Sequence, residues 1–147
     1  MPMTFFLFWK FKKEDLKLKL SFDHVHIICN DVEKMKDYFV NVFDGSLEFL
    51  DENFHGAPNA IVKVGEAKLF LRGVRPSESP GKNHPDSVMG VDHFSFSVDD
   101  VTQLSETLKT KGAEFIRDPA PVGMGGRVTA FIRGPEDIRI ELSEKDK

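Results

Sequence analysis

The sequence contains an internal duplication that aligns one histidine with another. Phe22-Asp23-His24-Val25 is repeated as Val91-Asp92-His93-Phe94, and the two histidines lie 69 residues apart. The same offset aligns the residues that follow each motif: Asn30-Asp31-Val32 with Asp99-Asp100-Val101, Met35 with Leu104, and Phe39 with Leu108. Two copies of one pattern predict two copies of one structural unit, and this constrains the fold more than any other feature of the chain.

The duplication continues toward the end of each copy, after a small slip in spacing. Glu48-Phe49 aligns with Glu114-Phe115, and Gly65 followed by Lys68-Leu69-Phe70-Leu71 aligns with Gly134 followed by Arg139-Ile140-Glu141-Leu142. Phe70 in the first copy therefore corresponds to Glu141 in the second. A duplication that keeps histidine at one strand position and places glutamate at another is the arrangement of a shared metal site.

Alternation along the predicted strands assigns the side chains of each copy to two faces. The apolar sets are Val25, Ile27 and Cys29; Phe94, Phe96 and Val98; and Ile138, Ile140 and Leu142. The opposite sets are Phe22, His24, His26 and Ile28; His93, Ser95 and Ser97; and Arg139, Glu141 and Ser143. We expect helices to cover the apolar faces and the polar faces to line a functional concavity.

Each copy is predicted to fold as a strand, a helix and three further strands, which is an α+β fold. Asn30 or Asp31 caps the first helix and Gly45 ends it; Asp99 or Asp100 caps the second and Gly112 ends it. The predicted organisation is an N-terminal extension (1–20), a first βαβββ module (21–73), a linker (74–89) and a second βαβββ module (90–147). The two modules are expected to form a half-open barrel around a metal cavity.

Charge and cysteine content restrict the surroundings of the chain. The single cysteine, Cys29, excludes an intrachain disulfide and favours a reducing, cytoplasmic location. A net charge of -4 gives no reason to expect nucleic acid as a partner. The apolar run Thr4–Trp9 is too short to span a membrane. We expect it to pack as a strand or flap on this chain or a dimer mate, and a membrane-surface segment is the alternative.

Four segments together resemble the vicinal oxygen chelate superfamily. They are the two openings FDHVHIICND and VDHFSFSVDD, the loop and strand GMGGRVTAFIRG, and the closing hairpin GPEDIRIEL. The superfamily includes glyoxalase I, methylmalonyl-CoA epimerase, fosfomycin-resistance enzymes, extradiol dioxygenases and metal-free bleomycin-binding proteins. The resemblance covers roughly residues 21 to 144, and it is specific for the fold and the metal position but not for the reaction.

The resemblance implies a ligand set at the first and last strand of each copy. The corresponding positions are His24, Phe70, His93 and Glu141, and Phe70 cannot bind metal. Two imidazoles and one carboxylate suit Fe, Mn, Ni, Co or Zn. Glu141 and His26 are the candidate catalytic groups, and the candidate substrate-binding residues on the same faces are Lys68, Phe70, Arg72, Ser95 and Arg139. His55 and His84 lie in predicted loops, and no role is assigned to them.

Four functions remain open for such a site on a small substrate. A glyoxalase-like lyase or isomerase, in which the metal holds neighbouring oxygens and stabilises an enediolate, is favoured by the chain length and the glycine-rich segment. An Fe(II) extradiol-type dioxygenase fits three ligands, but the single tyrosine, Tyr38, lies on a helix. The third is a fosfomycin-type thiol transferase, and the fourth is a metal-free drug-binding protein of the bleomycin-resistance type. Each copy supplies only part of the ligand set, so the ligands would come together either within one chain or across two. In either case a homodimer is expected, because strand edges and the apolar N-terminal segment would be exposed on a monomer.

Overall fold

The structure of the chain is a computed structural model, which describes residues 18–146. The expectation about residues 4–9 falls outside this range. The first module comprises β1 (His24–Ile28), α1 (Val32–Val42), β2 (Ser46–Phe54), β3 (Ala57–Val64) and β4 (Ala67–Arg72). The second comprises β5 (Phe94–Val98), α2 (Val101–Thr110), β6 (Glu114–Ala120), the 3-10 turn η1 (Met124–Gly126), β7 (Thr129–Arg133), the 3-10 turn η2 (Pro135–Asp137) and β8 (Arg139–Glu144).

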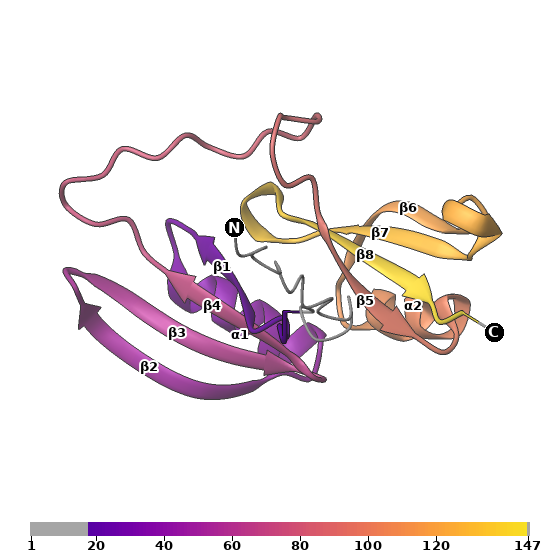
Figure 1. Cartoon of the computed structure of the whole chain (residues 1–147), viewed down its shortest axis with the longest axis horizontal. Helices are drawn as coiled ribbons and strands as arrows, with labels where there is room; N and C mark the ends of the chain where they lie inside the picture. The colour runs from indigo at the N-terminus through magenta and orange to yellow at the C-terminus, as the bar shows by residue number, and fades with distance from the viewer. Residues whose placement is uncertain (1–17, 147) are drawn as a thin grey trace, which may run out of the picture.

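The strands form two mixed sheets with the same topology. The orders are β1-β4-β3-β2 and β5-β8-β7-β6, and in each sheet the outer first strand runs parallel to the last strand. Figure 1 shows the two modules side by side, joined by a long connector without regular structure over residues 73–93. The chain is thus an α+β protein of two tandem modules, as predicted, but its sheets do not close into a barrel.

The strand register reproduces the equivalence that the duplication predicts. His26 lies opposite Phe70 in the β1–β4 pair, and Ser95 lies opposite Glu141 in the β5–β8 pair. Leu69 and Leu71 are buried in the core. Because side chains alternate along a strand, Phe70 lies on the other face, with the histidines of β1.

Both helices begin at the expected caps, but Gly45 does not end the first helix in the left-handed conformation expected of a glycine there. The side chains of Asp31 and Asp100 accept hydrogen bonds from the first turns of α1 and α2. After α1 the left-handed residue is Asp44, with φ 54°, rather than Gly45. A Cβ on Gly45 would lie 2.8 Å from the carbonyl oxygen of Phe39. Gly45 is therefore needed for close packing and not for a left-handed helix end.

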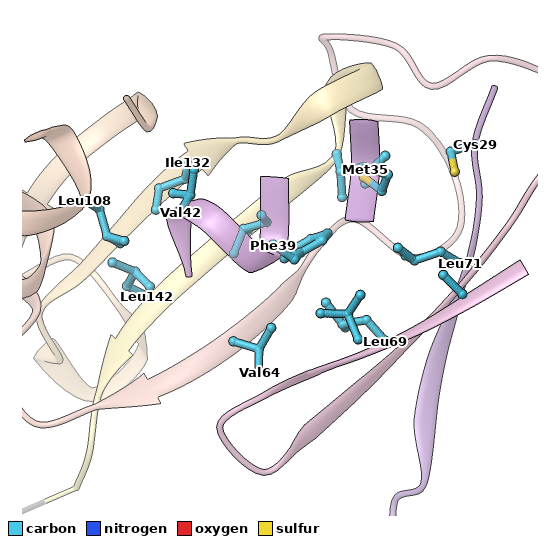
Figure 2. Packing of buried hydrophobic residues seen from close by; sticks show 14 of the residues in the cluster. Cys29, Met35, Phe39, Val42, Val64, Leu69, Leu71, Leu108, Ile132 and Leu142 are labelled. Carbon is cyan, nitrogen blue, oxygen red and sulfur yellow. The ribbon is translucent and has the colours of Figure 1, made fainter. Parts of the chain in front are cut away.

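One hydrophobic core unites the two modules. Buried α1 residues lie among core residues of both sheets, as Figure 2 shows for Phe39 and Val42 beside Leu69 and Ile132. Aromatic contacts join the modules as well, with ring centroids 6.3 Å apart for Phe39 and Phe94. Since both apolar sheet faces contribute to this core, the faces that carry the histidines are turned away from it.

A polar contact from the second module completes the first helix. Glu136 reaches from η2 to the start of α1, where its carboxylate accepts hydrogen bonds of 2.8 and 3.3 Å from the backbone N–H groups of Asn30 and Asp31. A carboxylate at this position satisfies free N–H groups and opposes the positive end of the helix dipole. Asp44 and Lys111 form an ion pair between the modules. Across residues 18–146, none of the helices has the length and apolar character needed to cross a bilayer.

Candidate metal centre

In the second module, two of the predicted ligands lie together. His93 Nε2 is 3.3 Å from Glu141 Oε2, on the polar face of the β5–β8 pair. Two atoms that each bind one ion at about 2.0–2.2 Å lie roughly 3.0–3.5 Å apart. The separation and the chemistry of this nitrogen–oxygen pair therefore fit a shared divalent ion.

The opposite nitrogen of His93 is held by a carboxylate. Asp92 Oδ2 lies 2.7 Å from His93 Nδ1, and Asp92 Oδ1 accepts a 2.8 Å hydrogen bond from Arg139. Arg139 also donates to the Pro85 carbonyl oxygen (2.6 Å) and to Ser87 Oγ (3.3 Å) in the connector. The hydrogen bond with His93 and the charge of Arg139 hold the pKa of the Asp92 carboxyl below its usual range.

The first module repeats this arrangement with an aromatic ring in place of glutamate. His24 Nδ1 lies 2.6 Å from Asp23 Oδ2, so the histidine–aspartate pair is present in both copies. The His24 ring stacks on Phe70 at a centroid distance of 3.8 Å and an interplanar angle of 10°. Phe70 thus occupies in the first module the place that Glu141 occupies in the second.

His26 lies beside this stack on the same face. Its ring meets the edge of Phe70 at a centroid distance of 5.8 Å. Partial burial, and then the charge of Arg72, lower the pKa of His26. The neutral imidazole is therefore favoured, which is the form that can accept a proton at neutral pH.

The structure does not bring all three predicted ligands together in one chain. His93 and Glu141 are paired, whereas His24 lies on the sheet of the other module. Within residues 18–146, no group of three His, Cys, Asp or Glu side chains is placed to hold a metal ion. A cavity of about 800 Å³ between β1, the connector and β8 borders His26 and His93, but its lining does not include His24 or Glu141.

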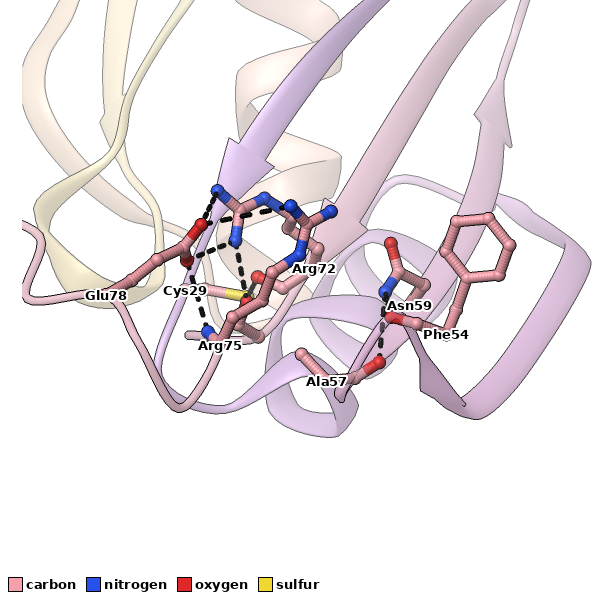
Figure 3. A network of polar contacts seen from close by, with 8 residues as sticks. Cys29, Phe54, Ala57, Asn59, Arg72, Arg75 and Glu78 are labelled. Atoms are coloured by element: carbon pink, nitrogen blue, oxygen red, sulfur yellow. Dashed lines mark hydrogen bonds and ion pairs between the residues drawn. The ribbon is translucent and has the colours of Figure 1, made fainter.

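The remaining predicted substrate-binding residues differ in how far they are engaged. Lys68 and Ser95 are exposed on the same faces as the histidines. Arg72 instead donates two hydrogen bonds, of 2.6 and 3.1 Å, to the carboxylate of Glu78 at the start of the connector (Figure 3). Arg72 and Arg139 therefore both secure the connector, one at each end.

The sequence interpretation assigned no role to Asp23 and Asp92. In a strand, neighbouring side chains point to opposite faces, so an aspartate directly before a histidine is not expected to contact it. For this reason neither contact was predicted. Each aspartate precedes its strand and is free of that constraint, since β1 begins at His24 and β5 at Phe94. The repetition of the Asp-His dipeptide at the 69-residue offset was the available signal.

Comparison with known proteins gives the family. The model of the Glyoxalase/Bleomycin resistance protein/Dioxygenase superfamily matches residues 21–142. A lactoylglutathione lyase of Arabidopsis thaliana is 30% identical over 129 residues, which are 84% of this chain and 44% of that protein. The mitochondrial methylmalonyl-CoA epimerase of Mus musculus is 26% identical over 128 residues, which are 83% of this chain and 71% of the epimerase.

A solved structure agrees with the fold. A mutant of the fosfomycin resistance protein FosX of Listeria monocytogenes, complexed with Mn(II) and 1S,2S-dihydroxypropylphosphonic acid, superposes with a TM-score of 0.63 at 14% identity. The alignment covers 86% of this chain and 90% of that one. The chain spans less than half the length of the plant lactoylglutathione lyases it matches. The chain belongs to the Glyoxalase/Bleomycin resistance protein/Dioxygenase superfamily.

Proposed function

We propose that the chain is a divalent-metal enzyme of the glyoxalase type, acting as a lyase or isomerase on a small substrate with neighbouring oxygen atoms. The observation that carries this proposal is the 3.3 Å approach of His93 Nε2 to Glu141 Oε2, at strand positions equivalent to His24 and Phe70. Lactoylglutathione lyases and methylmalonyl-CoA epimerases among the relatives support lyase or isomerase chemistry.

His93 and Glu141 of one chain would hold the metal together with His24 of a second chain. The shared core turns the two histidine-bearing faces away from each other within a chain, so a second copy is the simplest source of the third ligand. A homodimer would contain two such sites, each built from the first module of one copy and the second module of the other.

The side chains have distinct tasks in this proposal. A bound divalent ion would act as a Lewis acid on the neighbouring oxygens of the substrate. Glu141 is suited to move a proton beside them, and His26, favoured in its neutral form, is suited to exchange a proton with the substrate. Phe70 would form an apolar wall that excludes water, and Lys68 and Ser95 lie where they can contact polar groups of the substrate.

Metal titration under anaerobic conditions tests the ligand set. Fe, Mn, Co, Ni and Zn would each be titrated into the full chain, with the variants His24→Ala, His93→Ala and Glu141→Ala. We expect about one ion per chain for wild type and strongly reduced binding for each variant. His84→Ala is the matched control, because His84 is an exposed histidine of the connector. Unchanged stoichiometry in all three variants would overturn the ligand assignment.

Subunit complementation tests whether the site spans two chains. His24→Ala and Glu141→Ala chains would be co-expressed, so that a mixed dimer has one site with both substitutions and one site with neither. Random pairing should restore about one quarter of the wild-type sites. Co-expressed chains that sediment as dimers but bind no metal would contradict a shared site.

An Fe(II) dioxygenase is the second candidate function. It is favoured by Phe70, since an aromatic residue in place of a fourth ligand leaves three protein ligands and open positions for substrate and O2. Formation of lactoylglutathione by the metal-loaded chain would support the lyase. O2 consumption with a catechol and Fe(II), without lyase activity, would support the dioxygenase instead.

A further inference from the structure

We propose that Asp92 and Arg139 are positioning residues that hold neutral His93 with its proton on Nδ1, leaving the Nε2 lone pair directed toward Glu141 and the metal. This inference rests on the proposed metal centre. It assigns Arg139 to the support of a ligand rather than to substrate binding.

Two carboxylates compete for the single ring proton of neutral His93. Asp92 Oδ2 lies 2.7 Å from Nδ1, and Glu141 Oε2 lies 3.3 Å from Nε2. A charge-assisted hydrogen bond is strongest at about 2.7–2.9 Å, so the proton is favoured on the Asp92 side. Without Asp92, Glu141 would bind the proton on Nε2, the atom that a metal requires. The Asp92 carboxylate therefore decides which ring nitrogen is available as a ligand.

Arg139 holds Asp92 in the position that this selection requires. It donates to Asp92 Oδ1, which leaves Oδ2 free to accept from His93. Its other hydrogen bonds go to Pro85 and Ser87, so the guanidinium is fixed on three sides. An aspartate directly before its histidine is otherwise free to rotate into solvent, and a planar guanidinium with several fixed partners prevents this.

The first module supplies an internal comparison. Asp23 makes the equivalent contact with His24, at 2.6 Å, but its side chain is 75% exposed, whereas that of Asp92 is 45% exposed. Lys68 stands at the strand position equivalent to Arg139. His24 also faces an aromatic ring rather than a second carboxylate. Competition for the ring proton is therefore a property of His93.

Histidine 15N chemical shifts in the metal-free chain test the proposal directly. At mildly alkaline pH, wild-type His93 should show the Nδ1–H tautomer. Asp92→Ala should convert it to Nε2–H, and Arg139→Gln should produce a mixture. Asp23→Ala is the matched control and should leave the His93 tautomer unchanged. An Nδ1–H tautomer that persists in both Asp92→Ala and Arg139→Gln would overturn the proposal.

Metal affinity provides the second measurement. Loss of a residue that orients a ligand typically lowers metal affinity by about 10–100-fold, and we expect this for Asp92→Ala and a smaller loss for Arg139→Gln. A purely structural role would lower stability without changing the tautomer, and that result would also overturn the proposal. If wild type binds no metal, the proposed function fails, and the tautomer measurement still decides whether Asp92 and Arg139 position His93.

Discussion

The two modules share one scaffold and differ in what the scaffold presents. In both, an aspartate contacts Nδ1 of a histidine, and the ring of that histidine faces the last strand of the module. The first module presents Phe70 there and the second presents Glu141. The two modules therefore share the aspartate–histidine contact and differ in the residue that the histidine faces.

The divergence extends across each sheet. The row that contains Phe70 runs through His26, Phe70, Ile61 and Phe49, whereas the equivalent row of the second module runs through Ser95, Glu141, Phe131 and Arg117. Apart from His26, the first row is apolar and largely aromatic. The second row is mostly polar, with the guanidinium of Arg117 placed 5.2 Å from the ring centroid of Phe131. The row in the first module is suited to form an apolar wall, and the row in the second module is suited to bind charged groups.

The largest expected effect tests whether the modules share one core. Leu71 and Leu142 occupy equivalent positions and are fully buried, at 0% and 1% exposure. Truncation of a buried leucine to alanine costs about 2–5 kcal/mol. We expect Leu71→Ala and Leu142→Ala to lower the free energy of unfolding by similar amounts in one cooperative transition, measured by denaturant unfolding. Exposed Leu20→Ala is the control, and two separate transitions would contradict a common core.

Conversion of Glu141 to its counterpart in the first module should abolish metal binding at the proposed site. Glu141→Phe replaces the only carboxylate assigned as a ligand with the residue that stands at the equivalent position. The affinity loss should exceed the roughly 10–100-fold typical for supporting residues, because a ligand itself is removed. Isothermal titration with Mn(II) measures it. Affinity within threefold of wild type, or about 0.65 kcal/mol, would remove Glu141 from the ligand set.

The reverse substitution, Phe70→Glu, should strengthen metal binding, by less than Glu141→Phe weakens it. Phe70→Glu removes the stack on His24, which contributes about 0.5–1.5 kcal/mol to stability, and adds a fourth donor to the two imidazoles and one carboxylate. We expect slower metal dissociation, followed by chelator competition. Phe70→Leu, which removes the stack without adding a donor, is the matched control. Faster dissociation from Phe70→Glu than from Phe70→Leu would show that the first module cannot accept the ligand.

Glu136 links the two modules at the start of α1. Removal of its negative charge by Glu136→Gln tests how much this link contributes to stability. Glu136→Gln weakens the charge-assisted bonds to Asn30 and Asp31, and loss of a helix-cap interaction costs about 0.5–2 kcal/mol. Denaturant unfolding measures the difference. Glu66→Gln, at the exposed turn between β3 and β4, should change stability by less than about 0.5 kcal/mol. Equal effects of the two variants would mean that the cap contributes nothing.

The smallest expected effect is the change in Tm on loss of the ion pair between Arg72 and Glu78, at the N-terminal end of the connector. Hydrogen bonds from Arg72 and from the Arg75 backbone lower the pKa of Glu78 in the folded chain. A depressed folded-state pKa contributes stability that is present above the unfolded pKa and is lost as pH falls through the folded value. Wild type should therefore have a higher Tm than Glu78→Gln at neutral pH, and the difference should vanish in acid. A difference independent of pH would contradict the ion pair.

The features that could be predicted from the sequence are those that depend on local patterns of residues. Alternation and helical spacing determine which face a side chain occupies, so the burial of Cys29, the equivalence of Phe70 and Glu141 and the two helix caps were accessible. Burial raises the pKa of Cys29 to about 12, in agreement with its place on an apolar face.

Contacts between distant segments were not accessible to the same reasoning. The placement of α1 against both sheets separates His24 from His93 within the chain, and no local pattern encodes that packing. Arg139 gained its partners from the connector, which has no periodicity. Gly45 was assigned to a helix end because a glycine there usually adopts a left-handed conformation, whereas the structure uses it for contact with Phe39.

The position of Glu136 also has a consequence for the order of synthesis. A ribosome completes α1 long before it adds Glu136 and the residues of β7 and β8 that share a hydrophobic core with this helix. Until then, Met35 and Phe39, both 0% exposed in the finished fold, lack part of their final contacts. Contacts across such long separations slow folding and leave apolar surface open to aggregation. We therefore expect the first half of this chain to expose apolar surface until the second module has been synthesised.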